Sequence, residues 1–131
     1  MQYKFGDKIP NGEIMLRRIR PQWINSDRTI SAEAFRPRIC PNGRFEDGVS
    51  VDLERYLSRP VGNDYWSNKR KMATCRFLSD VVNALPPYEI VYNGPSLSHC
   101  IIAGDMEVLF ADEIVLEEIA ERSTLIHTPD I

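Results

Sequence analysis

The sequence predicts an α+β fold, in which a mainly antiparallel sheet is flanked by two to four helices. The chain has 131 residues, which is the length of a single compact domain, and we expect residues 1–131 to form one. Short apolar segments of strand length, separated by Asn-Gly turns, come first, and helical periodicity is interspersed later. This order of elements is typical of the α+β class.

Six segments have the length and apolar content of strands and are bounded by turn residues. They are residues 14–19, 29–35, 48–51, 72–77, 88–92 and 98–103. Asn-Gly pairs at 11–12, 42–43 and 93–94 tolerate the positive φ that tight turns demand. The third pair lies between the last two segments, so we predict that these two form a hairpin.

Apolar residues at helical spacing predict the helices. The clearest covers residues 111–122, where the apolar side chains at 115, 116, 119 and 120 form one stripe. Residues 78–85 form a second helix, which ends before two prolines. We expect a short helix over 52–57, with Ser50 or Asp52 as its cap, and either a helix or a surface excursion over 64–71.

Cysteine usage and missing motifs disfavour several classes of protein. Cys40, Cys75 and Cys100 are far apart and have no histidine at ligand spacing, which indicates reduced thiols in a cytoplasm and no metal site. No apolar segment has the length of a secretory signal or a membrane span. Phosphate-binding glycine loops and the signatures of kinases, zinc proteases and serine hydrolases are also missing. We therefore expect a cytoplasmic protein with no membrane contact and no cofactor.

Charge is distributed unevenly along the chain. Residues 1–76 hold 15 basic and 9 acidic side chains, a net charge of +6, whereas residues 77–131 hold 1 basic and 10 acidic, a net charge of −9. Arginine predominates in the basic part, and its planar guanidinium suits phosphate and carboxylate groups. The candidate ligand- or partner-binding residues of this part are Arg17, Arg20, Arg28, Arg36, Arg38 and Trp23.

The acidic part provides a second candidate surface. Glu113, Glu117 and Glu121 are four residues apart on the expected last helix, where each like-charged pair opposes the helix by about 0.2–0.5 kcal/mol. Three interpretations stay open. The glutamates form a solvated face, or they dock a basic partner, or they pair with the arginines of the same molecule.

His99 is the main candidate for chemistry, because it lies well inside the chain and histidine titrates near neutral pH. On a strand it shares a face with Leu97 and Ile101, which favours a core histidine with one satisfied hydrogen bond over a general acid or base. Arg18 lies on a strand face with two apolar residues. It therefore needs a partner charge, either in a buried ion pair or in a ligand.

Two serines begin short segments and are expected to be caps or turn residues. Neither Ser31 nor Ser50 has a base nearby in the sequence. An alternative assigns catalysis to His99, Arg18 and Ser31. That alternative is an analogy with the NAD site of mono-ADP-ribosyltransferase-like folds, which has an arginine on an early strand, a serine on a second strand and a late histidine or acidic residue. Here Arg18 and Ser31 would be the first two, and His99 or Glu107 would be the third.

Several short segments together resemble a group of small bacterial proteins. The residues that carry the resemblance are Leu-Arg-Arg-Ile at 16–19, Pro21, Trp23, Arg28, residues 31–35, Ser50-Val51, Pro95 and Ser98-His99. In the group, the corresponding segments read LRRIxPxW, SxAFRP, LSV and PxHA. Here Cys100 follows the histidine where the group has alanine. The resemblance implies a bacterial or phage origin and brings no activity to transfer.

Two functions are therefore expected. The first is a non-enzymatic binding or accessory protein whose charged surface docks a protein partner. The alternative is a small enzyme or binder that takes a nucleotide, a phosphorylated ligand or RNA in an arginine-rich pocket with His99. The alternative requires Arg18 and His99 to converge on one concavity, and it fails if His99 is sealed among its apolar neighbours.

Overall fold

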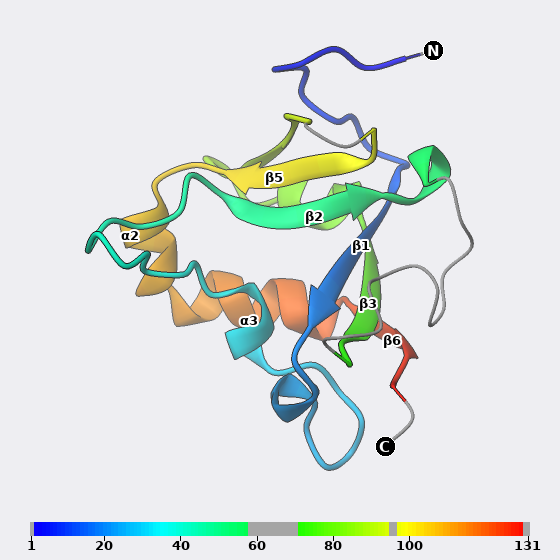
Figure 1. Cartoon of the computed structure of the whole chain (residues 1–131), viewed down its shortest axis with the longest axis vertical. Coiled ribbons are helices and arrows are strands. Elements are labelled where there is room, and N and C mark those ends of the chain that lie inside the picture. The colour runs from blue at the N-terminus through cyan, green and yellow to red at the C-terminus, as the bar shows by residue number, and fades with distance from the viewer. Residues whose placement is uncertain (1, 58–70, 95–96, 130–131) are drawn as a thin grey trace.

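A six-stranded antiparallel sheet organises the chain in the computed structural model, which describes residues 2–57, 71–94 and 97–129. The strand order is β4-β5-β2-β1-β3-β6 (Figure 1). The strands are β1 (Ile14–Ile19), β2 (Val49–Leu53), β3 (Ala73–Leu78), β4 (Glu89–Tyr92), β5 (His99–Ala103) and β6 (Thr124–His127). With the helices below, the sheet confirms the predicted α+β class.

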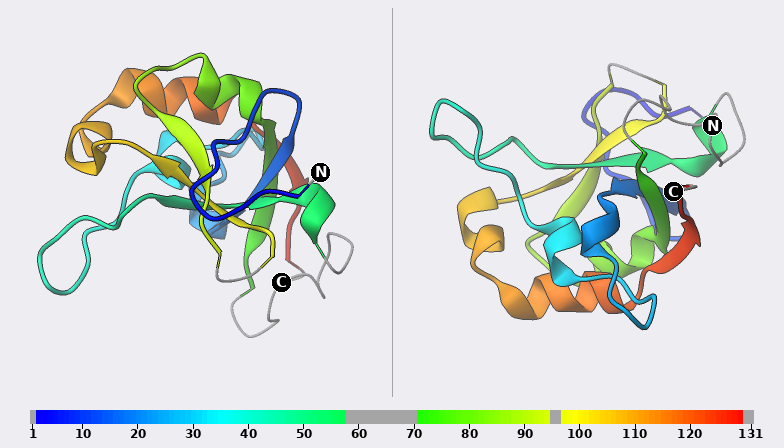
Figure 2. Two further views of the ribbon diagram at one scale, coloured as in Figure 1. Left: turned by 90° about the horizontal axis from the view of Figure 1, so that it is seen from above. Right: turned by 60° about the horizontal axis from the view of Figure 1, so that its bottom comes forward.

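Three α-helices gather on one side of this sheet (Figure 2). They are α1 (Ser79–Asn83), α2 (Met106–Phe110) and α3 (Glu113–Glu121). Three short 3-10 helices, η1 (Pro21–Trp23), η2 (Ala32–Phe35) and η3 (Glu54–Tyr56), complete the described elements. No helix in the described part of the chain is long and apolar enough to cross a bilayer.

The register of the strands divides their side chains between the covered face, under the helices, and the opposite face, which we call the open face although Leu16 and Thr74 on it are fully buried. Directly paired residues project to the same side of a sheet. Met15 pairs with Leu53 and with Phe77, and all three are buried in the core beneath the helices. The next residue, Leu16, pairs with Asp52, so it lies on the opposite face together with the polar side chains of β2 and β5. This second face provides one wall of the candidate site.

Most of the predicted elements are present, with ends displaced by a few residues. The segment 14–19 has the predicted bounds, and the hairpin of β4 and β5 is confirmed. The helices predicted over 78–85 and 111–122 correspond to α1 and α3. The prediction for 64–71 lies outside the described residues except for its last residue.

Two predicted elements are wrong. Residues 29–35 do not form a strand, because Ser31 Oγ accepts a hydrogen bond from the Glu33 backbone N–H at 3.2 Å and begins η2. In place of the helix expected over 52–57, the structure has only the 3-10 turn η3. Asp52 belongs to the sheet, because it pairs with Leu16 on one side and with His99 on the other. Ser50 is therefore a strand residue and not a helix cap.

Candidate functional site

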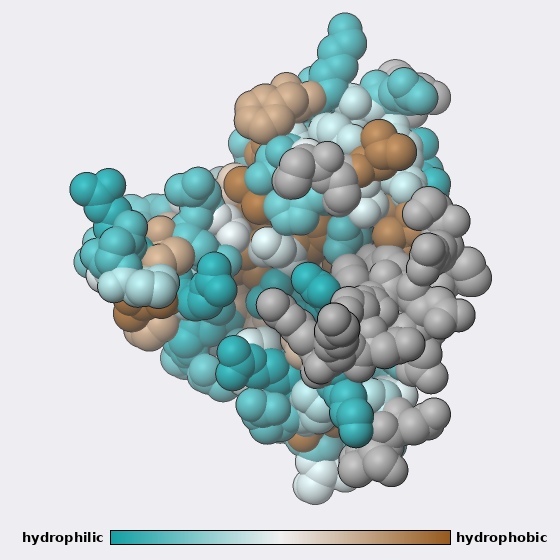
Figure 3. All heavy atoms as spheres, in the orientation of Figure 1, coloured by the Kyte–Doolittle hydropathy of each residue, from teal (hydrophilic) through white to brown (hydrophobic). Residues whose placement is uncertain are grey.

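An open groove of about 510 Å³ lies beside β1, β2 and β5, with η2 and the chain that follows it on its other side. Among the described residues, five arginines and three carboxylates line it. The arginines are Arg17, Arg18, Arg20, Arg36 and Arg38, and the carboxylates are Glu33, Glu46 and Asp52. Trp23, Ser50, His99 and Phe110 are also in its walls. Hydrophilic residues predominate on the visible surface of the molecule, with apolar residues showing between them (Figure 3).

The three carboxylates of the groove already have hydrogen-bond donors within the protein. Glu33 Oε1 lies 2.6 Å from Arg36 Nη2. Glu46 Oε2 accepts from the backbone N–H of Arg38 at 2.6 Å. Asp52 Oδ1 accepts from Ser98 Oγ at 2.8 Å. Glu33 is therefore paired with a positive charge, whereas Glu46 and Asp52 accept hydrogen bonds from uncharged donors.

Arg17 is a structural part of the groove wall. Its Nε donates to the Ala34 carbonyl and its Nη1 to the Ser50 carbonyl, both at 2.6 Å, and its guanidinium lies 5.8 Å from the Phe35 ring centroid. Burial lowers the pKa of this guanidinium. The arginine that the fold desolvates is thus Arg17. Arg18 lies on the other face of β1 and is exposed, so the burial expected for it is wrong, whereas its role as a ligand contact stays a prediction.

Arg36 connects the groove with the acidic helix. Its Nη2 lies 2.6 Å from Glu33 and 2.5 Å from Glu113, and its Nη1 donates to the Phe110 carbonyl. The hydrogen bonds to Glu33 and Glu113 raise the pKa of the Arg36 guanidinium, although burial opposes them. Pairing between the arginines and the acidic helix, one of the three open interpretations, therefore occurs at Arg36.

The remaining predicted arginines differ in their surroundings. Arg20 lies 5.5 Å over the Trp23 ring, a cation–π distance. Among the described residues, neither Arg20 nor Arg38 forms an ion pair. Arg28 does not line the groove; it is exposed in a turn and has φ 68°. The groove therefore gathers five of the six arginines singled out from the sequence.

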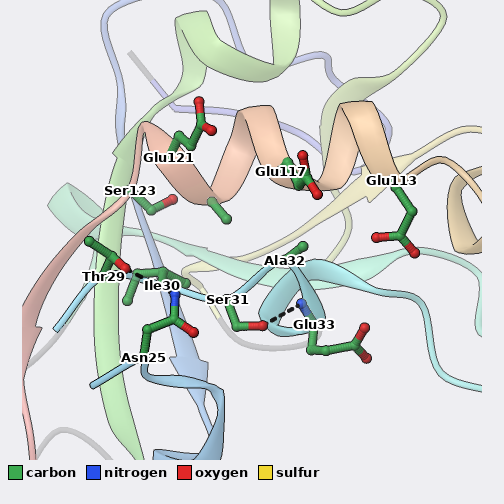
Figure 4. A pocket seen from close by; sticks show the side chains of 11 residues that line it. Asn25, Thr29, Ile30, Ser31, Ala32, Glu33, Glu113, Glu117, Glu121 and Ser123 are labelled. Carbon is green, nitrogen blue, oxygen red and sulfur yellow. Dashed lines mark hydrogen bonds between the residues drawn. The ribbon is translucent and has the colours of Figure 1, made fainter. Parts of the chain in front are cut away.

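Glu113, Glu117 and Glu121 face a different hollow, of about 540 Å³. Figure 4 shows their side chains spaced along α3, with Ser31 and Glu33 on the opposite wall. The described lining of this hollow contains no basic residue. Beyond the contact of Glu113 with Arg36, the acidic ladder thus lies apart from the arginine groove.

His99 is half-buried and contacts two polar side chains. Its Nδ1 lies 2.5 Å from Asn93 Oδ1 and its Nε2 lies 3.3 Å from Ser50 Oγ. The expectation of a core histidine is wrong, because the face it shares with Ile101 is the open face. Arg18 and His99 border the same groove, as the alternative hypothesis requires.

The other predicted catalytic residues do not join this pair. Ser31 caps η2, as expected of a cap or turn residue, and lines the acidic hollow. Glu107 lies in α2 and does not line the groove. The arrangement expected for an NAD site is therefore not assembled. The residue that sequence reasoning missed is Ser50, and its place two residues before Asp52 was the available signal, because alternate strand residues share a face.

Among the described residues, the thiols lie away from the groove and no cluster of metal ligands is present. Within residues 2–57, 71–94 and 97–129, no group of three or more His, Cys, Asp and Glu side chains could hold a metal ion. Cys75 and Cys100 are buried under the covered face, whereas Cys40 is half-buried. Burial raises the pKa of the Cys75 and Cys100 thiols to about 12. Neither of these two thiols lines the groove.

No protein-family model, curated protein or solved structure matches this chain. The resemblance to small bacterial proteins therefore stays a prediction. Function has to be argued from the geometry of the groove and from the chemistry of its side chains.

Proposed function

We propose that this protein binds a phosphorylated small molecule, such as a nucleotide, in the arginine-lined groove. The observation that carries the proposal is the charge of the described part of the lining: five arginines face three carboxylates, each of which already accepts a hydrogen bond from the protein. The surplus of positive charge in a concavity attracts an anion from solution.

Phosphate suits these side chains better than an isolated carboxylate does. Guanidinium groups bind phosphate oxygens through paired N–H donors, and several of them around one hollow can hold more than one phosphate. Arg20 and Arg38 form no ion pair among the described residues, so they are the expected phosphate contacts. Trp23, on the same wall, offers an aromatic surface on which a base would stack.

The size of the groove also favours a small ligand. Its volume of about 510 Å³ lies within the usual range for small-molecule and cofactor sites, roughly 300–1,000 Å³. Docking on a protein partner through a charged surface, the first expectation, has weaker support. Arg36 is already paired with Glu33 and Glu113, and the other arginines line a hollow instead of a flat surface.

Isothermal titration calorimetry with pyrophosphate, ADP and adenosine tests the proposal. We expect pyrophosphate and ADP to bind and adenosine to bind far more weakly, with affinities that fall as salt increases. Arg20→Ala combined with Arg38→Ala should weaken ADP binding at least about 100-fold, since each of the two lost phosphate contacts costs about 1.4 kcal/mol or more.

Arg44→Ala is the matched control, because Arg44 is an exposed arginine outside the groove. It should leave the affinity for ADP unchanged. Equal losses in the control and in the groove variant would mean that only net charge matters, and this would contradict a defined site. A salt-sensitive protein partner captured from the native host, with no binding of pyrophosphate or ADP, would favour the docking hypothesis instead.

A further inference from the structure

Three polar side chains on the open face form a relay that phosphate binding alone does not require. Asn93 Oδ1 lies 2.5 Å from His99 Nδ1, and Ser50 Oγ lies 3.3 Å from His99 Nε2. With an amide oxygen as its acceptor, Nδ1 carries the ring proton. The lone pair on Nε2 then faces the serine hydroxyl, which is the orientation that a general base needs.

The sheet itself sets the positions of these side chains. His99 is paired directly with Asp52, so Ser50, two residues before Asp52 on β2, lies diagonally across from it on the same face. Asn93 follows β4, and its backbone N–H donates to the His99 carbonyl at 3.2 Å. Ser50 and His99 therefore lie on neighbouring strands, a main-chain hydrogen bond holds Asn93 directly after β4, and a site built on strands is held more tightly than one on loops.

The relay opens onto the arginine groove. Ser50 is exposed, and both Ser50 and His99 line that groove, whereas Asn93 is not part of its lining. Arg17 Nη1 donates to the Ser50 carbonyl at 2.6 Å, which fixes a guanidinium beside the serine.

We propose that Ser50 is the nucleophile of a phosphoryl transfer from a phosphate ester bound in the groove, with His99 as general base and Asn93 as positioning residue. This inference rests on the proposed function, because the arginines must hold the phosphoryl group. Nucleophile, base and orienting group are present in the order that such sites share. The separation of 3.3 Å between Ser50 and His99 is within the looser range of sites without substrate.

The reaction balances with water as the second substrate. Ser50 Oγ attacks phosphorus, so the Oγ–P bond forms and the ester P–O bond breaks. The hydroxyl proton moves to His99 Nε2 and then to the departing alkoxide, which leaves as an alcohol. Water, deprotonated by the same Nε2, next attacks the phosphoserine; its P–Oγ bond breaks, Oγ regains a proton, and inorganic phosphate leaves.

A fluorophosphonate probe tests the nucleophile directly. Its reaction forms the Oγ–P bond, breaks P–F, and releases fluoride and the proton that His99 accepts. We expect intact mass spectrometry to show one adduct, mapped to Ser50, and no adduct in Ser50→Ala. His99→Gln should slow labelling at least about 100-fold, because general-base catalysis contributes about 10²–10⁴-fold. Ser26→Ala, at an exposed turn serine outside the groove, is the matched control and should label like the wild type.

Asn93 is tested by two variants with opposite expectations. Asn93→Asp retains an oxygen for Nδ1–H and should retain labelling, whereas Asn93→Leu should lose most of it. Nitrogen-15 NMR of His99 provides a readout that a purely structural role would not move. The Nδ1–H tautomer should predominate in the wild type and in Asn93→Asp, and it should decline in Asn93→Leu. The midpoint of urea unfolding of Asn93→Leu should equal that of the wild type, which shows that the variant is folded.

The outcomes separate this inference from the binding proposal. Pyrophosphate binding without any Ser50 adduct would overturn the relay and leave the binding proposal intact. A Ser50 adduct that depends on His99, in a protein that binds no pyrophosphate, would support the nucleophile and overturn the phosphate-ester substrate. Labelling at another residue, or at an unchanged rate in His99→Gln, would overturn the relay.

Discussion

Replacement of Arg17 by methionine should destabilise the fold by about 2–3 kcal/mol. Methionine retains much of the apolar length of the side chain but removes two donors, which now bind the Ala34 and Ser50 carbonyls at 2.6 Å. Each hydrogen bond from a charged donor contributes about 1.5–3 kcal/mol, or about 3–6 kcal/mol together. Loss of the guanidinium, whose pKa burial lowers, recovers roughly 1–3 kcal/mol of desolvation cost. The difference gives the expected net effect.

Urea unfolding followed by far-ultraviolet circular dichroism measures this effect. The midpoint should fall while the slope of free energy against urea stays constant, which would mean that stability has changed and the unfolded state has not. Arg44→Met, at an exposed turn position, provides the comparison and should stay within about 0.5 kcal/mol of the wild type. If Arg17→Met is equally harmless, the two hydrogen bonds do not hold η2 against β2, and the reasoning about this wall of the groove fails.

Three other predictions concern close packing at Gly48 and the burial of the cysteines. Gly48→Ala should lower stability by about 1–3 kcal/mol in thermal unfolding, because an added Cβ would lie 2.7 Å from Ile101 Cβ and 2.8 Å from a backbone carbonyl; an unchanged Tm would contradict this packing. Iodoacetamide at pH 8 should add one label to the native protein, at half-buried Cys40, because burial raises the pKa of Cys75 and Cys100 to about 12; a rapid second adduct by intact mass would refute it. These raised values also predict alkaline sensitivity. A neutral thiol favours the folded state, so its contribution is complete below the unfolded pKa of about 8.5 and is lost as pH rises towards 12. The stability advantage of wild type over Cys100→Ala should therefore shrink between pH 8 and pH 11, and urea midpoints that keep a constant difference would count against it.

The fold could be predicted from the sequence where the signal is local. Apolar segments and Asn-Gly turns located five of the six strands, and the stripe on α3 located that helix. The prediction of a strand over 29–35 was wrong because a single helix cap outweighed the β-forming residues around it. In this cap, Ser31 Oγ accepts a hydrogen bond from the Glu33 backbone N–H. Helix α2 was missed although its signal is local too: Asp105 Oδ1 accepts from the N–H groups of Glu107 and Val108 and begins it.

The candidate site depends on information that no short segment contains. Met15 and Leu16 are both apolar, so β1 does not reveal which of its faces the helices cover, and burial was expected of Arg18 where the fold instead desolvates Arg17. Ser50 meets His99 only through the pairing of β2 with β5, whose register is fixed by contacts across the whole domain. Arginines and the histidine could thus be singled out one by one, whereas their convergence could not be predicted.

The strand order has a consequence for folding while the chain is still being synthesised on the ribosome. Strand β1 emerges early but lies between β2 and β3, which are synthesised much later, and β2 then waits for β5. Such non-local pairing makes folding slow, on the order of milliseconds to seconds, because long loops must close before their contacts form. A nascent chain that stopped before β5 would expose one edge of β2, and an unpaired edge is a template for association with other chains. Nascent-chain proteolysis or chaperone capture should therefore be strongest in this interval and decline once residues 99–103 have left the exit tunnel.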